Sequence, residues 1–170
     1  MHFARWLSLW LVALGLTGCA GYKLGSTNGV TAGARSAQIM PFSNQTMEPR
    51  LGEVVTSQLR REMQRDGTYQ LASHYDGDII VSGVVVTYLR LPLSFQPTDA
   101  LTVTDYSVKL VAQVTARERS TGKVVFNERV TGSTLIIVGS DLTSAERQAL
   151  PLLAADFAKN ATARLVQGSW

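Results

Sequence analysis

The chain has 170 residues, of which 16 are Lys or Arg and 13 are Asp or Glu, so its formal net charge is +3. This length allows one small domain with a modest core. The weak positive charge comes without a run of Lys or Arg, which argues against nucleic-acid binding, and a single cysteine excludes a disulfide within one molecule.

The first residues are typical of an export signal. His2 and Arg5 precede an apolar segment, residues 6–16, which is shorter than the roughly 20 residues of a membrane-spanning helix but suits a signal-peptide core. The following Leu16-Thr17-Gly18-Cys19 resembles the lipobox of bacterial lipoproteins. That resemblance implies a signal peptide of residues 1–18 and acyl chains, such as palmitate, on Cys19. The alternative is an ordinary secretory signal with a stray cysteine, but a lone thiol in an oxidising compartment is a liability.

Removing residues 1–18 takes away one arginine and leaves a charge of +2. Ala20 would then stand second, and in lipoproteins of two-membrane bacteria the lack of Asp there implies release to the outer membrane. Residues 20–36 are rich in Gly, Ser, Thr and Ala, which favours a flexible tether. We expect a lipidated N-terminus and tether in residues 19–36 and a single domain in residues 37–170.

The first half of this domain begins with a strand, residues 38–42, followed by a turn. A helix is expected from Leu51, with Pro49 in its first turn and with Asp66-Gly67 as its end. Its buried stripe is predicted at helical spacing, at Leu51, Val54, Val55, Leu59 and Met63. A short strand is expected at residues 69–72.

The middle of the chain predicts a β-hairpin and the strand before it. Residues 79–91 are dense in β-branched side chains, with a bulge or close approach expected at Gly83. Two prolines in residues 92–98 predict a loop. From Tyr106 to Arg117 apolar and polar residues alternate, apart from Val111 on the polar side, which is typical of a strand with one buried and one solvated face. Residues 120–123 form the turn to a return strand, residues 123–138.

The last segment predicts a second helix. Thr143 and Glu146 match a capping box, Pro151 would kink or restart the helix, and Gly168 would end it. The predicted order is strand, helix, three strands, helix. The expected fold is α+β, a two-layer α/β sandwich in which a mostly antiparallel four-stranded sheet carries two helices on one face.

Little in the sequence indicates catalysis. His74 is the only histidine after residue 18, and it lies near Asp76 and Asp78 in a polar turn. A metal site normally needs several converging His, Cys, Asp or Glu ligands, and Asp is favoured in turns for its own sake. We therefore expect a protein that is not an enzyme and that needs neither metal nor cofactor.

The order of these pieces resembles the LptE family of lipopolysaccharide-assembly lipoproteins. The likeness runs from Cys19-Ala20-Gly21-Tyr22-Lys23-Leu24 through IMPFSNQT, the helix EPRLGEVVTSQLRREMQRDG and the strand DGDIIVSGVVVTYLRLP. It ends with residues 146–158 and Trp170. Each piece is weakly specific, and only their order together carries the resemblance.

This resemblance implies an outer-membrane lipoprotein that faces the periplasm and acts as plug and assembly partner of the LptD β-barrel. The pair would deliver lipopolysaccharide to the outer leaflet. Contact with lipid A needs cations for its phosphates beside apolar surface for its acyl chains. Our candidates are the strand cations Arg90, Lys109 and Arg117, with residues 91–95 as apolar contact. The alternative for these cations is simple solvation of the outer face of the sheet.

A second family offers an alternative function. Residues 39–73, followed by DIIVSGVV, also resemble the beginning of lipoproteins that bind and activate a peptidoglycan synthase. Such activators usually need a long tether to reach the synthase, whereas residues 20–36 are a short one. The sequence therefore favours the lipopolysaccharide function.

Overall fold

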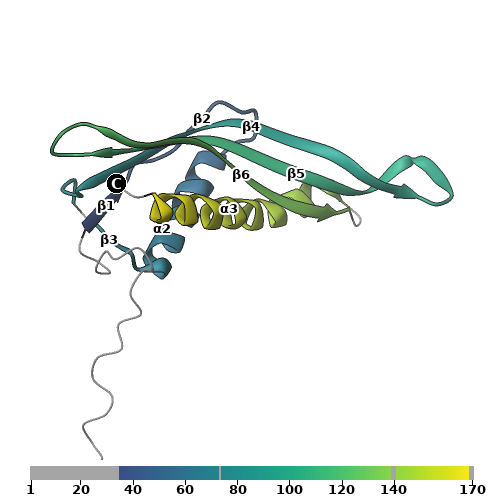
Figure 1. The fold of residues 1–170 in the computed structure, drawn as a ribbon. Helices are drawn as coiled ribbons and strands as arrows, with labels where there is room; N and C mark the ends of the chain where they lie inside the picture. The colour runs from purple at the N-terminus through teal and green to yellow at the C-terminus, as the bar shows by residue number, and fades with distance from the viewer. Residues whose placement is uncertain (1–34, 73, 139–140, 169–170) are drawn as a thin grey trace, which may run out of the picture.

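The computed structural model describes residues 35–72, 74–138 and 141–168. The expected signal peptide, Cys19 and most of the expected tether lie outside these residues. Two helices lie on one face of a long sheet (Figure 1), so the predicted two-layer α+β class is confirmed. In chain order the elements are β1 (Arg35–Ile39), β2 (Ser43–Asn44), α2 (Leu51–Asp66), β3 (Tyr69–Leu71), β4 (Ile79–Gln96), β5 (Asp99–Glu118), β6 (Val124–Ile137) and α3 (Leu142–Gln167).

The sheet has six described strands rather than the predicted four, and its strand directions are mixed. The order is β3-β1-β4-β5-β6, with β2 also paired to β4. The β4–β5 and β5–β6 pairs are antiparallel, whereas β1 runs parallel to β3 and β4, and β2 runs parallel to β4. Parallel neighbours need a crossover connection, and α2 supplies it between β1 and β3. The prediction of a mostly antiparallel four-stranded sheet was therefore wrong in number and in the direction of the short strands.

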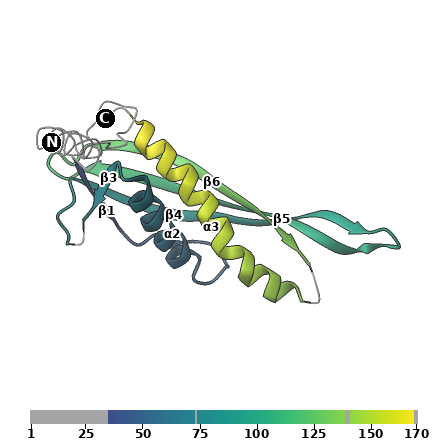
Figure 2. The same ribbon diagram turned by 90° about the horizontal axis from the view of Figure 1, so that it is seen from below.

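The predicted loop at residues 92–98 was wrong for residues 92–96, because β4 continues to Gln96, and only Pro97 and Thr98 form a turn. Pro92 lies opposite Tyr106 of β5. Strands β1 and β2 pair with β4 only as far as Val85, so beyond that residue this side of β4 is a free edge. A proline at an edge costs no ladder hydrogen bond. The β4–β5 hairpin consequently projects past both helices (Figure 2).

Helix α2 begins and ends at two left-handed residues. Its N-cap is Arg50, with φ 61° and no hydrogen bond from its side chain, so Pro49 lies before the helix and not in its first turn as predicted. Its end at Gly67 (φ 74°) is as predicted, and the Gly67 N–H donates to the carbonyl of Met63.

Helix α3 begins differently from the prediction. The carboxylate of Asp141 accepts hydrogen bonds from the backbone N–H groups of Thr143 and Ser144, so the predicted capping box of Thr143 and Glu146 is wrong. The side chain of Glu146 points to the sheet instead. The helix runs through Pro151 without restarting and ends at Gly168, as predicted.

The core lies between the helices and one face of the sheet. The alternation predicted for β5 is confirmed, since Val108, Leu110, Ala112, Val114 and Ala116 are all buried. The helices cover them with two buried rows: Leu51, Val55, Leu59 and Met63 of α2, and Leu153, Phe157, Ala161 and Leu165 of α3. Val54, which was predicted in the first row, is only partly buried.

Two strand glycines allow close packing against Phe42 and Phe157 in this core. A Cβ atom on Gly83 would lie 2.1 Å from the ring of Phe42, and one on Gly132 would lie 2.6 Å from Cβ of Phe157. The two rings meet edge to face, with centroids 6.2 Å apart. The predicted close approach at Gly83 is therefore confirmed, and Gly132 lets the backbone of α3 approach β6 closely.

Candidate lipid-contact surface

The face of the sheet opposite the helices is uncovered by any described element, and we call it the open face. Directly paired residues of neighbouring strands share a face, so the register defines it. Three rows cross it near the hairpin: Leu89–Lys109–Ser133, Leu91–Ser107–Leu135 and Ser94–Asp105–Ile137. The open face thus places a lysine one row away from several apolar side chains.

The four apolar residues of these rows are exposed, and they lie in two pairs on β4 and β6, on either side of the polar side chains of β5. Leu89 and Leu91 of β4 are each 48% exposed, and Leu135 and Ile137 of β6 are 59% and 76% exposed. Residues this apolar are more often found in a core, and the hairpin adds further exposed apolar side chains at Leu93, Phe95 and Leu101. So many exposed apolar side chains at one end of the sheet indicate a site of contact with another molecule.

Of the three predicted cations, Lys109 and Arg117 lie on the open face and are exposed. They are eight residues apart on β5, which is about 27 Å at about 3.4 Å per residue, so the structure does not bring them together. Sequence reasoning missed Arg129 of β6, which lies opposite Gln113, between the other two. Arg129 could have been predicted from the sequence, because it stands two residues from both Asn127 and Thr131 and therefore shares the solvated side of β6 with them. Lys109, Arg117 and Arg129 have no ion-pair partner among the described residues.

Arg90 lies on the other face of the sheet. It pairs with the buried Val108, and its guanidinium donates to the carboxylate of Glu146 on α3 at 3.1 Å. The hydroxyl of Tyr88 donates to the same carboxylate at 2.5 Å. Burial, reinforced by this hydrogen bond, raises the pKa of Tyr88 well above its usual value. Burial and the charge of Glu146 also raise the pKa of Glu48, although Arg90 opposes this. Arg90 thus holds α3 to β4.

The polar turn that contains His74 has structural contacts. The carboxylate of Asp78 accepts two hydrogen bonds from Ser36, from its N–H and its hydroxyl, both at 2.8 Å. These bonds lower the pKa of Asp78. In the described part of the chain no group of three His, Cys, Asp or Glu side chains converges as a metal site would require.

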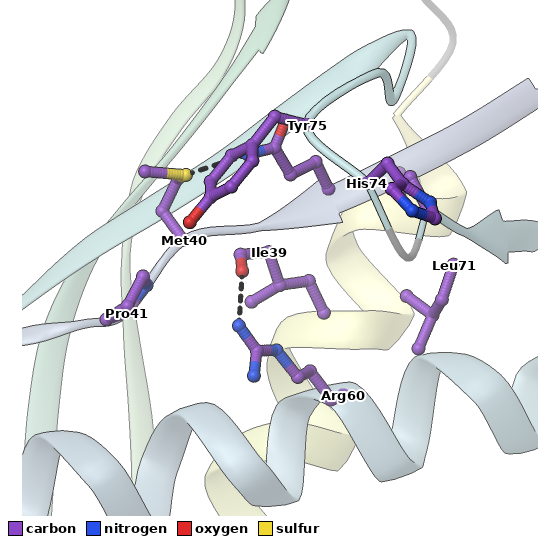
Figure 3. A pocket seen from close by; sticks show the side chains of 10 residues that line it. Ile39, Met40, Pro41, Arg60, Leu71, His74 and Tyr75 are labelled. Atoms are coloured by element: carbon purple, nitrogen blue, oxygen red, sulfur yellow. Dashed lines mark hydrogen bonds between the residues drawn. The ribbon is translucent and has the colours of Figure 1, made fainter.

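A cavity of about 380 Å³ lies beside this turn, between β1 and α2 (Figure 3). His74, Tyr75 and Arg60 line it. The Arg60 guanidinium donates to the carbonyl of Ile39 at 2.8 Å, at a point on β1 beyond the end of its pairing with β3. The arginine therefore satisfies a backbone group that a longer β3 would have paired.

Comparison with solved structures shows the class of fold. The chain is similar to a protein from Xanthomonas campestris (9% identity, TM-score 0.61, covering 85% of this chain and 90% of that one). It is also similar to a hypothetical protein from Chlamydia trachomatis (10%, TM-score 0.58, 79% and 98%) and to a minor lipoprotein from Acinetobacter baumannii (13%, TM-score 0.53, 78% and 93%). At these identities the likeness is one of fold alone.

The family follows from the sequence itself. The model of the LptE family, described as lipopolysaccharide-assembly, matches residues 34–165. The chain belongs to this family, as its resemblance indicated, and the family is not one of enzymes. A search of curated proteins finds no match. No helix in the described residues is both long enough and apolar enough to cross a membrane.

Proposed function

We propose that this protein is an outer-membrane lipoprotein, anchored through acyl chains on Cys19 and facing the periplasm. It acts in lipopolysaccharide transport and assembly as plug and assembly partner of an LptD-type β-barrel. The observation that carries the proposal is the family match over residues 34–165.

The dimensions of the sheet support the role of a plug. Strands β4 and β5 have 18 and 20 residues, which corresponds to about 60 Å at about 3.3 Å per residue. The hydrocarbon core of a membrane is about 30 Å thick. A sheet of this length, covered by helices on one side only, suits a place inside a tall barrel, whose wall would face the open face.

The open face supports contact with a glycolipid. We propose that Lys109 binds the phosphates of lipid A, because an ammonium donates strong charge-assisted hydrogen bonds to phosphate. The neighbouring Leu89 and Leu91 would contact acyl chains. Arg117 would serve a second, separate contact, since it lies about 27 Å away along β5. Arg90 is the weakest of the original candidates because Glu146 already binds it.

An affinity purification tests the partner. The tagged mature lipoprotein is solubilised from outer membranes in mild detergent, and the co-purifying proteins are identified by mass spectrometry. A near-stoichiometric large β-barrel is expected. A peptidoglycan synthase without a barrel would refute the proposal and support activation of cell-wall synthesis instead.

The glycolipid contact is tested by Lys109→Ala, with Lys123→Ala as a matched control on an exposed residue of the β5–β6 turn. A hydrogen bond to a charged group is worth about 1.5–3 kcal/mol, so Lys109→Ala should weaken binding of purified lipopolysaccharide about tenfold or more. The Lys123 variant should bind like the wild type. Equal affinities of the two variants would remove Lys109 from the site.

A further inference from the structure

Strand β6 is the last strand of the sheet, so one side of its backbone faces away from β5. The direction of each residue follows from two hydrogen bonds. The Ser133 N–H donates to Asp156 of α3, away from β5, whereas the Val138 N–H donates to Thr104 of β5. Since backbone groups alternate along a strand, residues 131, 133, 135 and 137 direct their N–H and C=O groups outward.

Helix α3 caps the middle of this edge with side chains from one row of its surface. The Asp156 carboxylate accepts from the Ser133 N–H at 2.8 Å, and the Asn160 amide donates to the Thr131 carbonyl at 2.9 Å. One turn further on, Arg164 forms an ion pair with Glu128 at 3.1 Å. These three residues are spaced four apart, so they lie on one face of the helix.

The fourth member of the row does not cap the edge. Leu152, one turn before Asp156, is apolar and 62% exposed. Beyond Ser133 the outward backbone groups belong to Leu135 and Ile137, and no described residue forms a hydrogen bond with them. We call Leu135, Ile137 and Leu152 the uncapped end of the edge.

This end also lacks the charges that protect free edges. Natural edge strands are usually blocked by charged side chains, prolines or bulges. Residues 130–138 carry no charge, whereas Glu128 and Arg129 stand at the other end of the strand. The uncapped end therefore offers unpaired backbone groups flanked by apolar side chains, which is the surface to which an uncharged extended strand binds by β-strand addition.

We propose that the uncapped end of β6 docks an extended, uncharged loop segment of the partner barrel, because the wall strands of a closed barrel have no free edge; this segment continues the sheet beyond β6. This inference rests on the proposed function, because the occupant is a segment of that barrel. Specificity comes from Leu135 and Ile137 on the open face and from Leu152 on the helix side, and affinity comes from the backbone hydrogen bonds of residues 135 and 137.

A second copy of this chain fits the site less well. Edge-to-edge pairing of two copies would bury only a few side chains from each. The buried area would be far below the roughly 1,600 Å² of a standard interface, and most of both open faces would stay uncovered. A larger partner can bind the edge and the adjoining part of the open face together, because the side chains of Leu135 and Ile137 lie on that face.

The test removes one backbone donor without touching the fold. Leu135→Pro deletes an N–H that points away from β5, so the β5–β6 ladder keeps its bonds, and proline is tolerated at such positions. Leu135→Thr is the matched control, since it shortens the side chain but keeps the N–H. Both variants are purified from outer membranes as tagged lipoproteins, and thermal melts report their folding. We expect Leu135→Pro to co-purify at least tenfold less barrel than the wild type, and Leu135→Thr to co-purify nearly as much as the wild type.

A photo-crosslinking amino acid gives a second readout that does not depend on the proline variant folding. Placed at position 135 or 152 it should crosslink to the barrel, and at position 61, on the exposed side of α2 and away from the open face, it should not. Wild-type recovery of the barrel by Leu135→Pro, or a crosslink from position 135 to a second copy, would overturn strand addition by the barrel. If the wild type itself recovers no barrel, the proposed function fails and this inference fails with it. If the barrel is recovered but position 135 does not crosslink, only this inference fails.

Discussion

Replacing Phe157 by alanine tests whether the two aromatic rings hold the layers of the fold together. Phe157 is fully buried, meets the ring of Phe42 edge to face and lies against Gly132. Truncation of a buried phenylalanine costs about 3–5 kcal/mol through lost transfer free energy and the cavity left behind. The aromatic pair contributes about 0.5–1.5 kcal/mol of this. Since domains of this size are stable by about 5–15 kcal/mol, the variant should be severely destabilised.

The measurement is equilibrium unfolding in urea of the chain without residues 1–19. The midpoint should fall while the slope stays constant, because the surface exposed on unfolding hardly changes. Phe157→Leu is the control: it keeps most of the volume and should cost about 1.5 kcal/mol. A double-mutant cycle with Phe42→Ala should give a coupling of about 0.5–1.5 kcal/mol.

Two results would refute this reasoning. A loss below about 1.5 kcal/mol for Phe157→Ala would mean that the site collapses around the cavity and that the rings do not carry the packing. Strict additivity of the Phe42 and Phe157 variants would mean that the edge-to-face contact has no energy of its own.

Three further predictions concern the helix ends and one tyrosine. Hydrogen bonds from Ser144 and Thr143 lower the pKa of Asp141. Its contribution to stability is therefore present above the usual carboxyl pKa of about 4 and is lost as the pH falls further. When the unfolding midpoint is followed into acid, Asp141→Asn should lose less stability than the wild type, because asparagine caps the helix without titrating. Arg50 has φ 61°, so Arg50→Gly should be more stable than Arg50→Ala by about 1 kcal/mol in urea, and equal midpoints would show that the residue is unstrained. Because the folded pKa of Tyr88 is raised, its contribution is present below about pH 10 and lost above it; Tyr88→Phe should flatten this alkaline decline, and an unchanged decline would exclude Tyr88 as its cause.

Much of the fold was predictable because local patterns agree with it. The alternation along β5, the apolar row of α2 apart from Val54, and the helix end at Gly67 each depend on neighbouring residues alone, and each was predicted correctly. The family could also be inferred from the sequence, because the order of the elements can be predicted from it. The three contact cations were harder to predict from the sequence, since the face on which a strand residue lies depends on register. Arg90 and Lys109 are both strand cations, yet they lie on opposite faces of the sheet.

The errors share one physical cause, which is that the decisive contacts are distant in the chain. From its neighbours alone, Pro92 predicts a loop. It lies in a strand because β1 and β2 pair with β4 only as far as Val85, which leaves Pro92 at a free edge. Glu146 matches a local capping box, but Tyr88 and Arg90, more than 50 residues away, bind its carboxylate. The sequence by itself determined the element types outside residues 92–96, the buried rows and the family. Only the tertiary structure decided the strand order, the open face and the uncapped end of β6, because each arises where backbone edges and faces from remote segments meet or fail to meet.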